Sequence, residues 1–241
     1  RNLDKKIISK PLNLQSFKFE KLEINSLSYK YPLTSRNVLE NVNLKIKKGD
    51  FLGIIGESGS GKTTLIDIIL GLLTSENKAS NIYLNAEPLS DQIDKWQSIV
   101  AYIPQNIFLI DDTIKNNITL EEDENNISEN QFKDAMRISQ LETTIKNLPE
   151  GVDTNVGDDG VKLSGGQRQR IILARAIYHQ KEFIIFDEAT SSLDSFTEDS
   201  IMRDIYKFKG DKTVIIISHK LDILKNCDKV IKLLDGKISY E

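Results

Sequence analysis

The stretch Gly56-Glu57-Ser58-Gly59-Ser60-Gly61-Lys62-Thr63 matches the pattern G-x-x-x-x-G-K-[ST]. It lies between the apolar run Phe51 to Ile55, which predicts a strand, and Thr63 to Leu73, which predicts a buried helix ending near Gly71. In that setting glycines let backbone N–H groups curl around a triphosphate, Lys62 supplies positive charge, and the Thr63 hydroxyl can ligate Mg²⁺. The stretch therefore predicts a phosphate-binding loop.

A second apolar run, Phe183 to Phe186, ends in the two carboxylates Asp187 and Glu188. These acids follow a predicted buried strand, and ligands bind at the carboxyl ends of strands in open α/β sheets. Asp187 is placed to hold Mg²⁺ or its waters, and Glu188 to polarise the water that attacks a γ-phosphate. Taken alone, Glu188 is as well explained as a helix-capping acid, but the phosphate loop favours the catalytic interpretation.

Strand and helix patterns alternate after Ser164, with a helix to Tyr178, the strand at 183–186, a helix at 195–208 and a strand at 214–217. A further helix and a strand pair across Asp235-Gly236 follow. This alternation predicts a doubly wound parallel sheet. Nearer the N-terminus, apolar residues alternate over 22–27 and 42–46, which predicts an antiparallel sheet.

Residues 113–148 lack strand-like runs and carry helical spacing at Phe132, Met136 and Ile138, with Ser128 as a candidate cap. They predict a helical insertion. Residues 1–20 are polar and basic without a sustained period, which predicts a linker or arm.

Composition narrows the class of protein. The 241 residues are 39% hydrophobic and 28% charged, as in a globular domain. The net charge is −4 with acids and bases interspersed, which argues against a nucleic-acid partner. The single cysteine, Cys227, excludes an internal disulfide and indicates a reducing compartment. The apolar run Leu65 to Leu73 is interrupted by Asp67 and is too short to span a membrane.

The order of the motifs resembles the ATP-binding-cassette (ABC) family over residues 20–241. After the glycine loop come Gln105 in Tyr-Ile-Pro-Gln, Leu-Ser-Gly-Gly-Gln at 163–167, the Asp187-Glu188 pair, Ser-Ser-Leu-Asp at 191–194, and Ser218-His219. The resemblance implies a RecA-like P-loop NTPase core with an antiparallel β subdomain and an inserted α-helical subdomain over about 106–164. Residues 1–19 would be an arm that follows an absent transmembrane domain.

The resemblance also implies a role for each matching residue. ATP would bind to Tyr31, Val38, Gly56, Glu57, Ser58, Gly59, Ser60, Gly61, Lys62, Thr63 and Thr64. Tyr31 would stack on adenine, with Tyr29 as its rival and a plain strand aromatic as the alternative for both. Glu188, His219 and Gln105 would be catalytic, and Thr63, Gln105 and Asp187 would hold Mg²⁺.

The signature residues Leu163, Ser164, Gly165, Gly166 and Gln167 would bind the γ-phosphate held by a second copy of the domain. Asp194 would cross the interface of that homodimer, so that two chains complete two ATP sites. We expect His179 to be structural or exposed and Cys227 to be a packed, small apolar residue.

Finer detail indicates the exporter branch of the family. Residues 154–160 resemble the exporter loop Thr-Glu-Val-Gly-Glu-Arg-Gly, with Asp159 in place of the arginine, and residues 111–114 resemble flippases of lipid-linked or polysaccharide precursors. We therefore expect MgATP hydrolysis to drive alternating access at the cytoplasmic face of a membrane, most simply the bacterial inner membrane. Because the chain begins with Arg1, we also expect six spanning helices upstream. An importer ATPase and a soluble, non-transport ABC protein are the alternatives.

Overall fold

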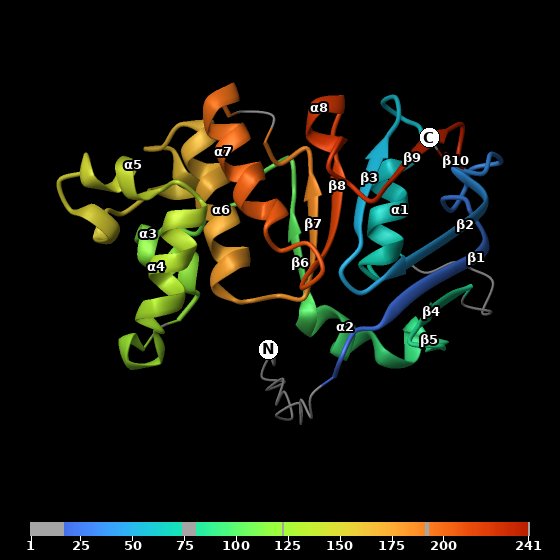
Figure 1. The fold of residues 1–241 in the computed structure, drawn as a ribbon, viewed down its shortest axis with the longest axis horizontal. Helices are drawn as coiled ribbons and strands as arrows, with labels where there is room; N and C mark the ends of the chain where they lie inside the picture. Colours follow the sequence, from blue (N-terminus) through green and yellow to red (C-terminus); the bar gives the residue numbers. More distant parts are fainter. Residues whose placement is uncertain (1–16, 74–80, 122, 191–192, 241) are drawn as a thin grey trace, which may run out of the picture.

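A computed structural model describes residues 17–73, 81–121, 123–190 and 193–240. Its elements form a central six-stranded sheet, a smaller four-stranded sheet and a group of inserted helices (Figure 1). The predicted α/β class with its β subdomain and helical subdomain is confirmed. Within the described ranges, no helix has the length and apolar character needed to cross a membrane.

The central sheet has the strand order β10-β9-β3-β8-β7-β6. Its strands are β3 (Phe51–Ile55), β6 (Val100–Ile103), β7 (Phe183–Asp187), β8 (Thr213–Ile217), β9 (Lys229–Leu234) and β10 (Lys237–Tyr240). Neighbouring strands are parallel except for β9 and β10, which form an antiparallel hairpin. The parallel pairing places the carboxyl ends of β3, β7 and β8 at one edge of the sheet, as the sequence predicts.

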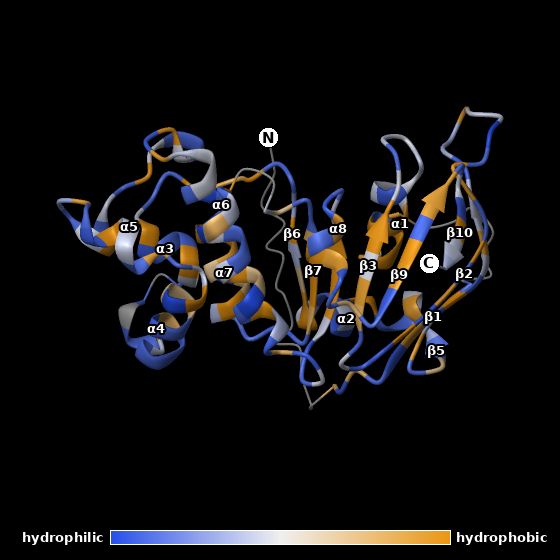
Figure 2. Cartoon of the chain, turned by 45° about the horizontal axis from the view of Figure 1, so that its top comes forward, coloured by the Kyte–Doolittle hydropathy of each residue, from blue (hydrophilic) through white to orange (hydrophobic). Residues whose placement is uncertain are grey.

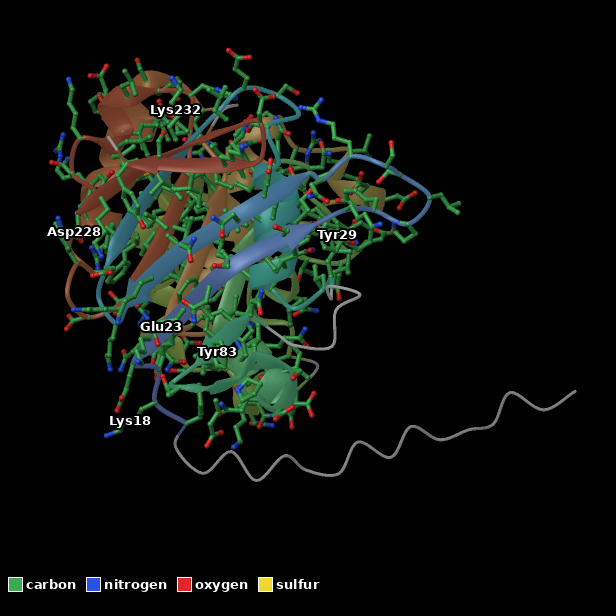
Figure 3. All side chains as sticks on the ribbon, turned by 90° about the vertical axis from the view of Figure 1, so that its right-hand side faces the viewer. Lys18, Glu23, Tyr29, Tyr83, Asp228 and Lys232 are labelled. Atoms are coloured by element: carbon green, nitrogen blue, oxygen red, sulfur yellow. The ribbon has the colours of Figure 1, made fainter. Side chains whose placement is uncertain are left out.

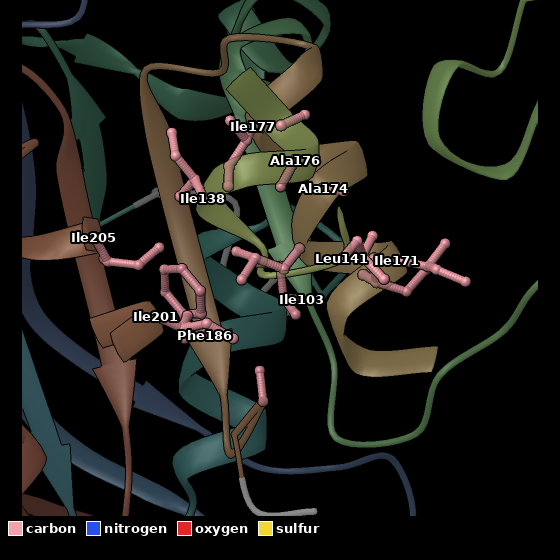
Figure 4. Packing of buried hydrophobic residues seen from close by; sticks show 14 of the residues in the cluster. Ile103, Ile138, Leu141, Ile171, Ala174, Ala176, Ile177, Phe186, Ile201 and Ile205 are labelled. Carbon is pink, nitrogen blue, oxygen red and sulfur yellow. The ribbon is translucent and has the colours of Figure 1, made fainter. Parts of the chain in front are cut away.

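Two apolar cores lie on opposite faces of this sheet. Phe183 and Ile185 belong to one core, whereas Ile184 and Phe186 belong to the other. The split follows from the two-residue period of a strand, and it explains why buried parallel strands are apolar throughout. Figure 2 shows the apolar character of β3 and β9, and Figure 4 shows Phe186 among buried isoleucines of the second core.

The smaller sheet has the order β2-β1-β4-β5 and is antiparallel, as predicted. Its strands are β1 (Lys21–Tyr29), β2 (Leu39–Lys47), β4 (Ile82–Leu84) and β5 (Glu87–Pro88). On its outer side (Figure 3), Glu23 accepts ion pairs from Lys21 at 2.7 Å and Lys45 at 2.6 Å. These two lysines lower the pKa of Glu23.

The helices outside the insertion are α1 (Lys62–Ile69), α2 (Ile93–Ile99), α6 (Gly165–Tyr178), α7 (Ser195–Tyr206) and α8 (Leu221–Leu224), with the short 3-10 helix η1 (Leu89–Gln92). Helix α1 ends before Gly71, near the predicted point, because Gly71 adopts a left-handed φ of +74°. The indole N–H of Trp96 then donates to the carbonyl of Ile69 at 2.7 Å, which satisfies one free carbonyl of that helix end.

The insertion lies between β6 and α6 and contains α3 (Ile114–Thr119), α4 (Glu129–Ile138) and α5 (Glu142–Lys146), with the 3-10 helices η2 (Glu124–Asn126), η3 (Gly151–Asp153) and η4 (Asp158–Gly160). Its predicted helical character is confirmed. Ser128 is the N-cap residue of α4, as predicted, although its side chain makes no capping hydrogen bond. Its backbone N–H instead donates to the Tyr178 hydroxyl at 3.2 Å, because α6 packs against this turn.

The predicted arm lies largely outside the described residues, but its last residues do not behave as an arm. Phe19 is 1% exposed and packs in the core beneath the central sheet. Its ring centroid lies 5.3 Å from that of Phe183, edge to face, and 5.7 Å from that of Trp96. The domain therefore uses the segment before β1 to close its core.

We expect Phe19→Ala to lower the free energy of unfolding by about 3 to 5 kcal/mol, because it leaves a cavity between two aromatic rings. Urea denaturation of the 241-residue chain measures this change. Phe196→Ala is the matched control: that ring is 83% exposed, and its loss should cost less than about 0.5 kcal/mol. A loss below about 1 kcal/mol for Phe19→Ala would contradict the assignment of this segment to the core.

Candidate active site

The glycine loop connects β3 to α1, and close contacts explain its composition. A Cβ on Gly56 would lie 2.5 Å from the carbonyl oxygen of Leu233, and one on Gly61 would lie 2.9 Å from that of Val38. Gly61 also has a φ of +105°, in the left-handed region. The Lys62 ammonium donates to the carbonyl oxygens of Gly56 at 2.7 Å and Glu57 at 2.9 Å, so the loop curls around this charge.

A cavity of about 380 Å³ opens beside this loop. It is lined by Val38, Ser58, Gly59, Gly61, Lys62, Thr63, Thr64, Gln105, Asp187, Glu188 and His219. Every one of these residues is among those the sequence singles out. Val38 lies just before β2, and the others lie at or just after the ends of β3, β6, β7 and β8 or begin α1. The predicted residues Gly56, Glu57, Ser60 and Tyr31 lie next to this group but do not line the cavity.

Glu188 is held between two other polar side chains of the cavity. The Gln105 amide donates to Glu188 Oε2 at 2.8 Å, and His219 Nε2 lies 2.9 Å from Glu188 Oε1. Glu188 has a φ of +51°, an uncommon conformation for a residue with a side chain. Its backbone N–H donates to the Ile217 carbonyl at 3.1 Å, which fixes this conformation at the end of the sheet. The three predicted catalytic residues are therefore brought into direct contact.

Asp187 lies at the end of β7, partly buried under the cavity. Burial raises the pKa of its carboxyl, and the neighbouring Glu188 acts in the same direction, whereas the Tyr102 hydrogen bond and the Lys62 charge lower it. The Tyr102 hydroxyl donates to Asp187 Oδ2 at 2.9 Å. Burial, and then the charge of Asp187, also raise the pKa of Asp67 on α1. The sequence does not point to Tyr102 or Asp67, because their nearness to Asp187 depends on the order of strands and helices.

The donor atoms at this place fit a magnesium ion. Thr63 is exposed in the cavity, and its hydroxyl, the Asp187 carboxylate and the Gln105 amide supply oxygen ligands. Oxygen donors with one or two carboxylates are what Mg²⁺ prefers alongside phosphate oxygens.

The two candidate aromatic residues have different environments. Tyr29 is 7% exposed and part of a core, whereas Tyr31 is 36% exposed. Their rings meet edge to face with centroids 5.3 Å apart. The Tyr31 and Thr64 hydroxyls form a hydrogen bond of 3.1 Å, so Tyr31 lies against the first turn of α1. The adenine ring of a nucleotide bound beside the glycine loop would therefore contact Tyr31 and not Tyr29.

The signature residues lie outside the cavity, at the start of α6. Ser164 is the N-cap residue: its hydroxyl accepts from the Gln167 backbone N–H at 3.3 Å, and its own N–H donates to Gln167 Oε1 at 2.8 Å. This capping box gives Gln167 a structural task, and the spacing Ser164-x-x-Gln167 is the one by which a sequence indicates such a cap. Leu163 is buried below the loop, while Ser164 remains exposed.

Asp194 caps the next helix in a similar way. Its carboxylate accepts from the Thr197 backbone N–H at 3.0 Å, and this bond is the main cause that lowers the pKa of Asp194. Ser191 and Ser192 of the same motif lie outside the described residues. Asp194 is absent from the cavity lining, like the signature loop.

The remaining two singled-out residues have structural surroundings. His179 ends α6, and burial lowers the pKa of its imidazole. Burial also raises the pKa of the Cys227 thiol to about 11, so the thiol is neutral at physiological pH. Cys227 packs at the edge of the second core, as expected for a small apolar residue.

Known proteins match this chain along most of its length. A family model described as "ABC transporter" matches residues 39–191. The ATP-dependent lipid A-core flippase of Ralstonia nicotianae is 34% identical over 219 residues, which are 90% of this chain and 37% of that protein. The alpha-hemolysin translocation ATP-binding protein HlyB of Escherichia coli O157:H7 is 38% identical over 222 residues, 91% of this chain and 31% of that protein.

A solved structure of a bacterial Atm1-family ABC exporter with ATP bound superposes with a TM-score of 0.84 at 26% identity, over 92% of this chain and 38% of that one. The chain thus spans about a third of the length of the curated relatives it matches. The family match covers more than half of the chain and contains the glycine loop, Gln105, the signature residues and both carboxylates. The chain belongs to the ABC transporter family, as one of its ATP-binding and ATP-hydrolysing domains.

Proposed function

We propose that this chain binds MgATP in the cavity beside the glycine loop and uses its hydrolysis to power an ABC exporter or flippase. The observation that carries the proposal is the contact of Glu188 with both Gln105 and His219 at the mouth of a loop that surrounds Lys62. A phosphate-binding charge, a proton acceptor and two orienting groups thereby share one cavity.

The proposed chemistry is attack of a water molecule on the γ-phosphorus of ATP, which breaks the bond from that phosphorus to the β–γ bridging oxygen and releases ADP and inorganic phosphate. Lys62 would exchange its bonds to loop carbonyls for bonds to β and γ oxygens. Glu188 would accept the proton of the attacking water, with Gln105 fixing the carboxylate and the water in line. His219 would donate to the γ-phosphate. When bound to Thr63, Asp187 and Gln105, Mg²⁺ would neutralise developing charge on the phosphate oxygens.

We propose further that two copies of this chain share two ATP molecules. The signature loop presents Ser164 and the start of the 14-residue helix α6 to solvent, away from the cavity of its own chain. Helix N-termini favour anions, so this loop suits a γ-phosphate held by a second copy. Asp194, at the start of α7, would meet the partner across the same interface.

The proposal of export is supported by the pairing of two exporter-like segments and by the names of the relatives. Residues 112–114 pair with residues 154–156 through Ile114 N–H to Thr154 O at 3.1 Å and Val156 N–H to Asp112 O at 3.0 Å. The two exporter-like stretches therefore form one surface, on which Asp159 is exposed with a φ of +50°. One of the two relatives described above is named a flippase and the other a translocation protein. These names support export over import or a non-transport role. This chain would lie at the cytoplasmic face of a membrane, with a transmembrane domain as its partner.

We expect Lys62→Ala to weaken MgATP binding. A charge-assisted phosphate contact is worth about 1.5 to 3 kcal/mol, which corresponds to about a 10- to 150-fold higher Kd. Isothermal titration calorimetry with the 241-residue chain measures this change. Lys95→Ala, at an exposed position of α2, is the control and should leave the Kd unchanged. Equal affinity of wild type and Lys62→Ala would refute the assignment of the loop.

We expect Glu188→Gln to bind ATP but to hydrolyse it about 10²- to 10⁴-fold more slowly, because the amide retains the size and loses the proton acceptor. Single-turnover phosphate release measures the rate. Glu150→Gln, at an exposed position before η3, should retain the wild-type rate. Wild-type turnover by Glu188→Gln would count against its role as the base.

The shared-site proposal predicts that Glu188→Gln elutes as a dimer with ATP and as a monomer with ADP in size-exclusion chromatography. Adding Ser164→Arg to this variant should abolish the dimer, because the arginine would collide with the γ-phosphate pocket of the second copy. It should not change ATP affinity at low protein concentration, since Ser164 does not line the cavity of its own chain. A dimer that persists with Ser164→Arg would contradict the arrangement.

A further inference from the structure

Tyr102 contacts Asp187 but does not itself line the cavity. It lies on β6, the edge strand of the central sheet, and pairs in parallel register with Ile185 of β7. Residues in register point to the same face, and so do residues two apart on a strand. Tyr102, Ile185 and Asp187 therefore share the face that α1 covers, which explains how the Tyr102 hydroxyl reaches Asp187 Oδ2 at 2.9 Å.

Tyr102 is separated from the reacting groups. It is absent from the cavity that Lys62, Asp187 and Glu188 line. It lines instead a groove at the edge of the sheet, together with Phe108 and Leu120. A group in this position touches neither nucleotide nor metal, so any effect on the reaction must pass through Asp187.

The surroundings of Asp187 show why its orientation needs a donor. Glu188 follows it directly, and Asp67 of α1 is close enough to interact with it electrostatically. Both are acids that repel the Asp187 carboxylate, and Lys62 attracts it from the cavity side. The Tyr102 hydroxyl is the neutral donor in this group. It engages Oδ2 of Asp187, a residue that also lines the cavity.

We propose that Tyr102 is a positioning residue that fixes the Asp187 carboxylate for the magnesium ion of MgATP. This inference rests on the proposed function and adds a residue to it. Hydrogen-bond partners of metal-ligating carboxylates set the orientation of the ligand, and their loss costs about 10- to 100-fold in metal affinity. A phenylalanine at this position keeps the ring packing and removes only the donor.

The test is a titration of Mn²⁺, followed by electron paramagnetic resonance, into the 241-residue chain saturated with the non-hydrolysable analogue adenylyl imidodiphosphate. For Tyr102→Phe we expect the Kd for Mn²⁺ to rise about 10-fold or more. The affinity for the analogue in EDTA, measured by calorimetry, should stay at the wild-type value, because Tyr102 does not line the nucleotide cavity.

Tyr206→Phe is the matched control. Its hydroxyl also lies in a partly buried place, where it donates to the carbonyl of Ile223, and neither residue lines the nucleotide cavity. This variant loses one hydroxyl of the same kind and should keep the wild-type Kd for Mn²⁺. Thermal unfolding of both variants shows whether either change disturbs the fold.

The outcomes separate the inference from the function on which it rests. An unchanged Kd for Mn²⁺ in Tyr102→Phe, with wild type binding metal and nucleotide normally, overturns the role of Tyr102 alone. A parallel loss of metal affinity and metal-free nucleotide affinity, or an equal effect of Tyr206→Phe, shows general loosening and also overturns it. A wild-type chain that binds no metal with the nucleotide overturns the proposed function as well.

Discussion

The parallel pairing of β3, β8 and β7 is the constraint on which the rest of the structure depends. Its register sets Ile54 beside Ile217 and Asp187 beside Ile217, so three strands end at the same level. The groups that follow those ends are the glycine loop, Glu188 and His219. The loop lies more than a hundred residues before the other two in sequence, yet all three meet at one edge. Each strand is held by ladder hydrogen bonds and by apolar packing on both faces, so the edge is rigid where the chemistry needs fixed distances.

The residues inside the sheet and the residues just past its end differ in character. The residues inside the sheet are apolar and alternate between two cores, whereas the residues just past its end are polar, and Glu188 has a left-handed backbone. An uncommon backbone conformation persists only where its surroundings fix it, and here the Ile217 carbonyl and two side chains do so. The conformation of Glu188 is thus fixed both by the end of the sheet, through Ile217, and by its neighbours in the site, Gln105 and His219.

The signature loop caps α6 within its own chain and also leaves the start of that helix exposed. Its Ser164 and Gln167 satisfy the first backbone groups of α6 within the chain, and the same cap leaves the helix end open to solvent. A site that needs groups from two copies can form only when both are present. In the proposed function, this makes ATP part of the interface, since the cavity and the signature loop lie on different parts of the molecule.

The glycine loop, the buried strands, the helical insertion and the family could all be predicted from the sequence. They depend on spacing over a few residues, such as glycines around Lys62 or an apolar run that ends in Asp187, and local patterns record such spacing directly. Other features depended on which elements become neighbours. Phe19 closes a core because Phe183 and Trp96 lie beside it, and Tyr29 is buried while Tyr31 is not.

Tyr102 meets Asp187 only because β6 pairs with β7, although 85 residues separate the two in sequence. No local pattern contains that pairing, because an edge strand of four residues has few apolar positions to indicate its neighbour or its register. The sequence by itself determined which groups we propose to carry the chemistry. The tertiary structure decided which side chains hold those groups in place, because such contacts are made between elements whose order in space differs from their order in the chain.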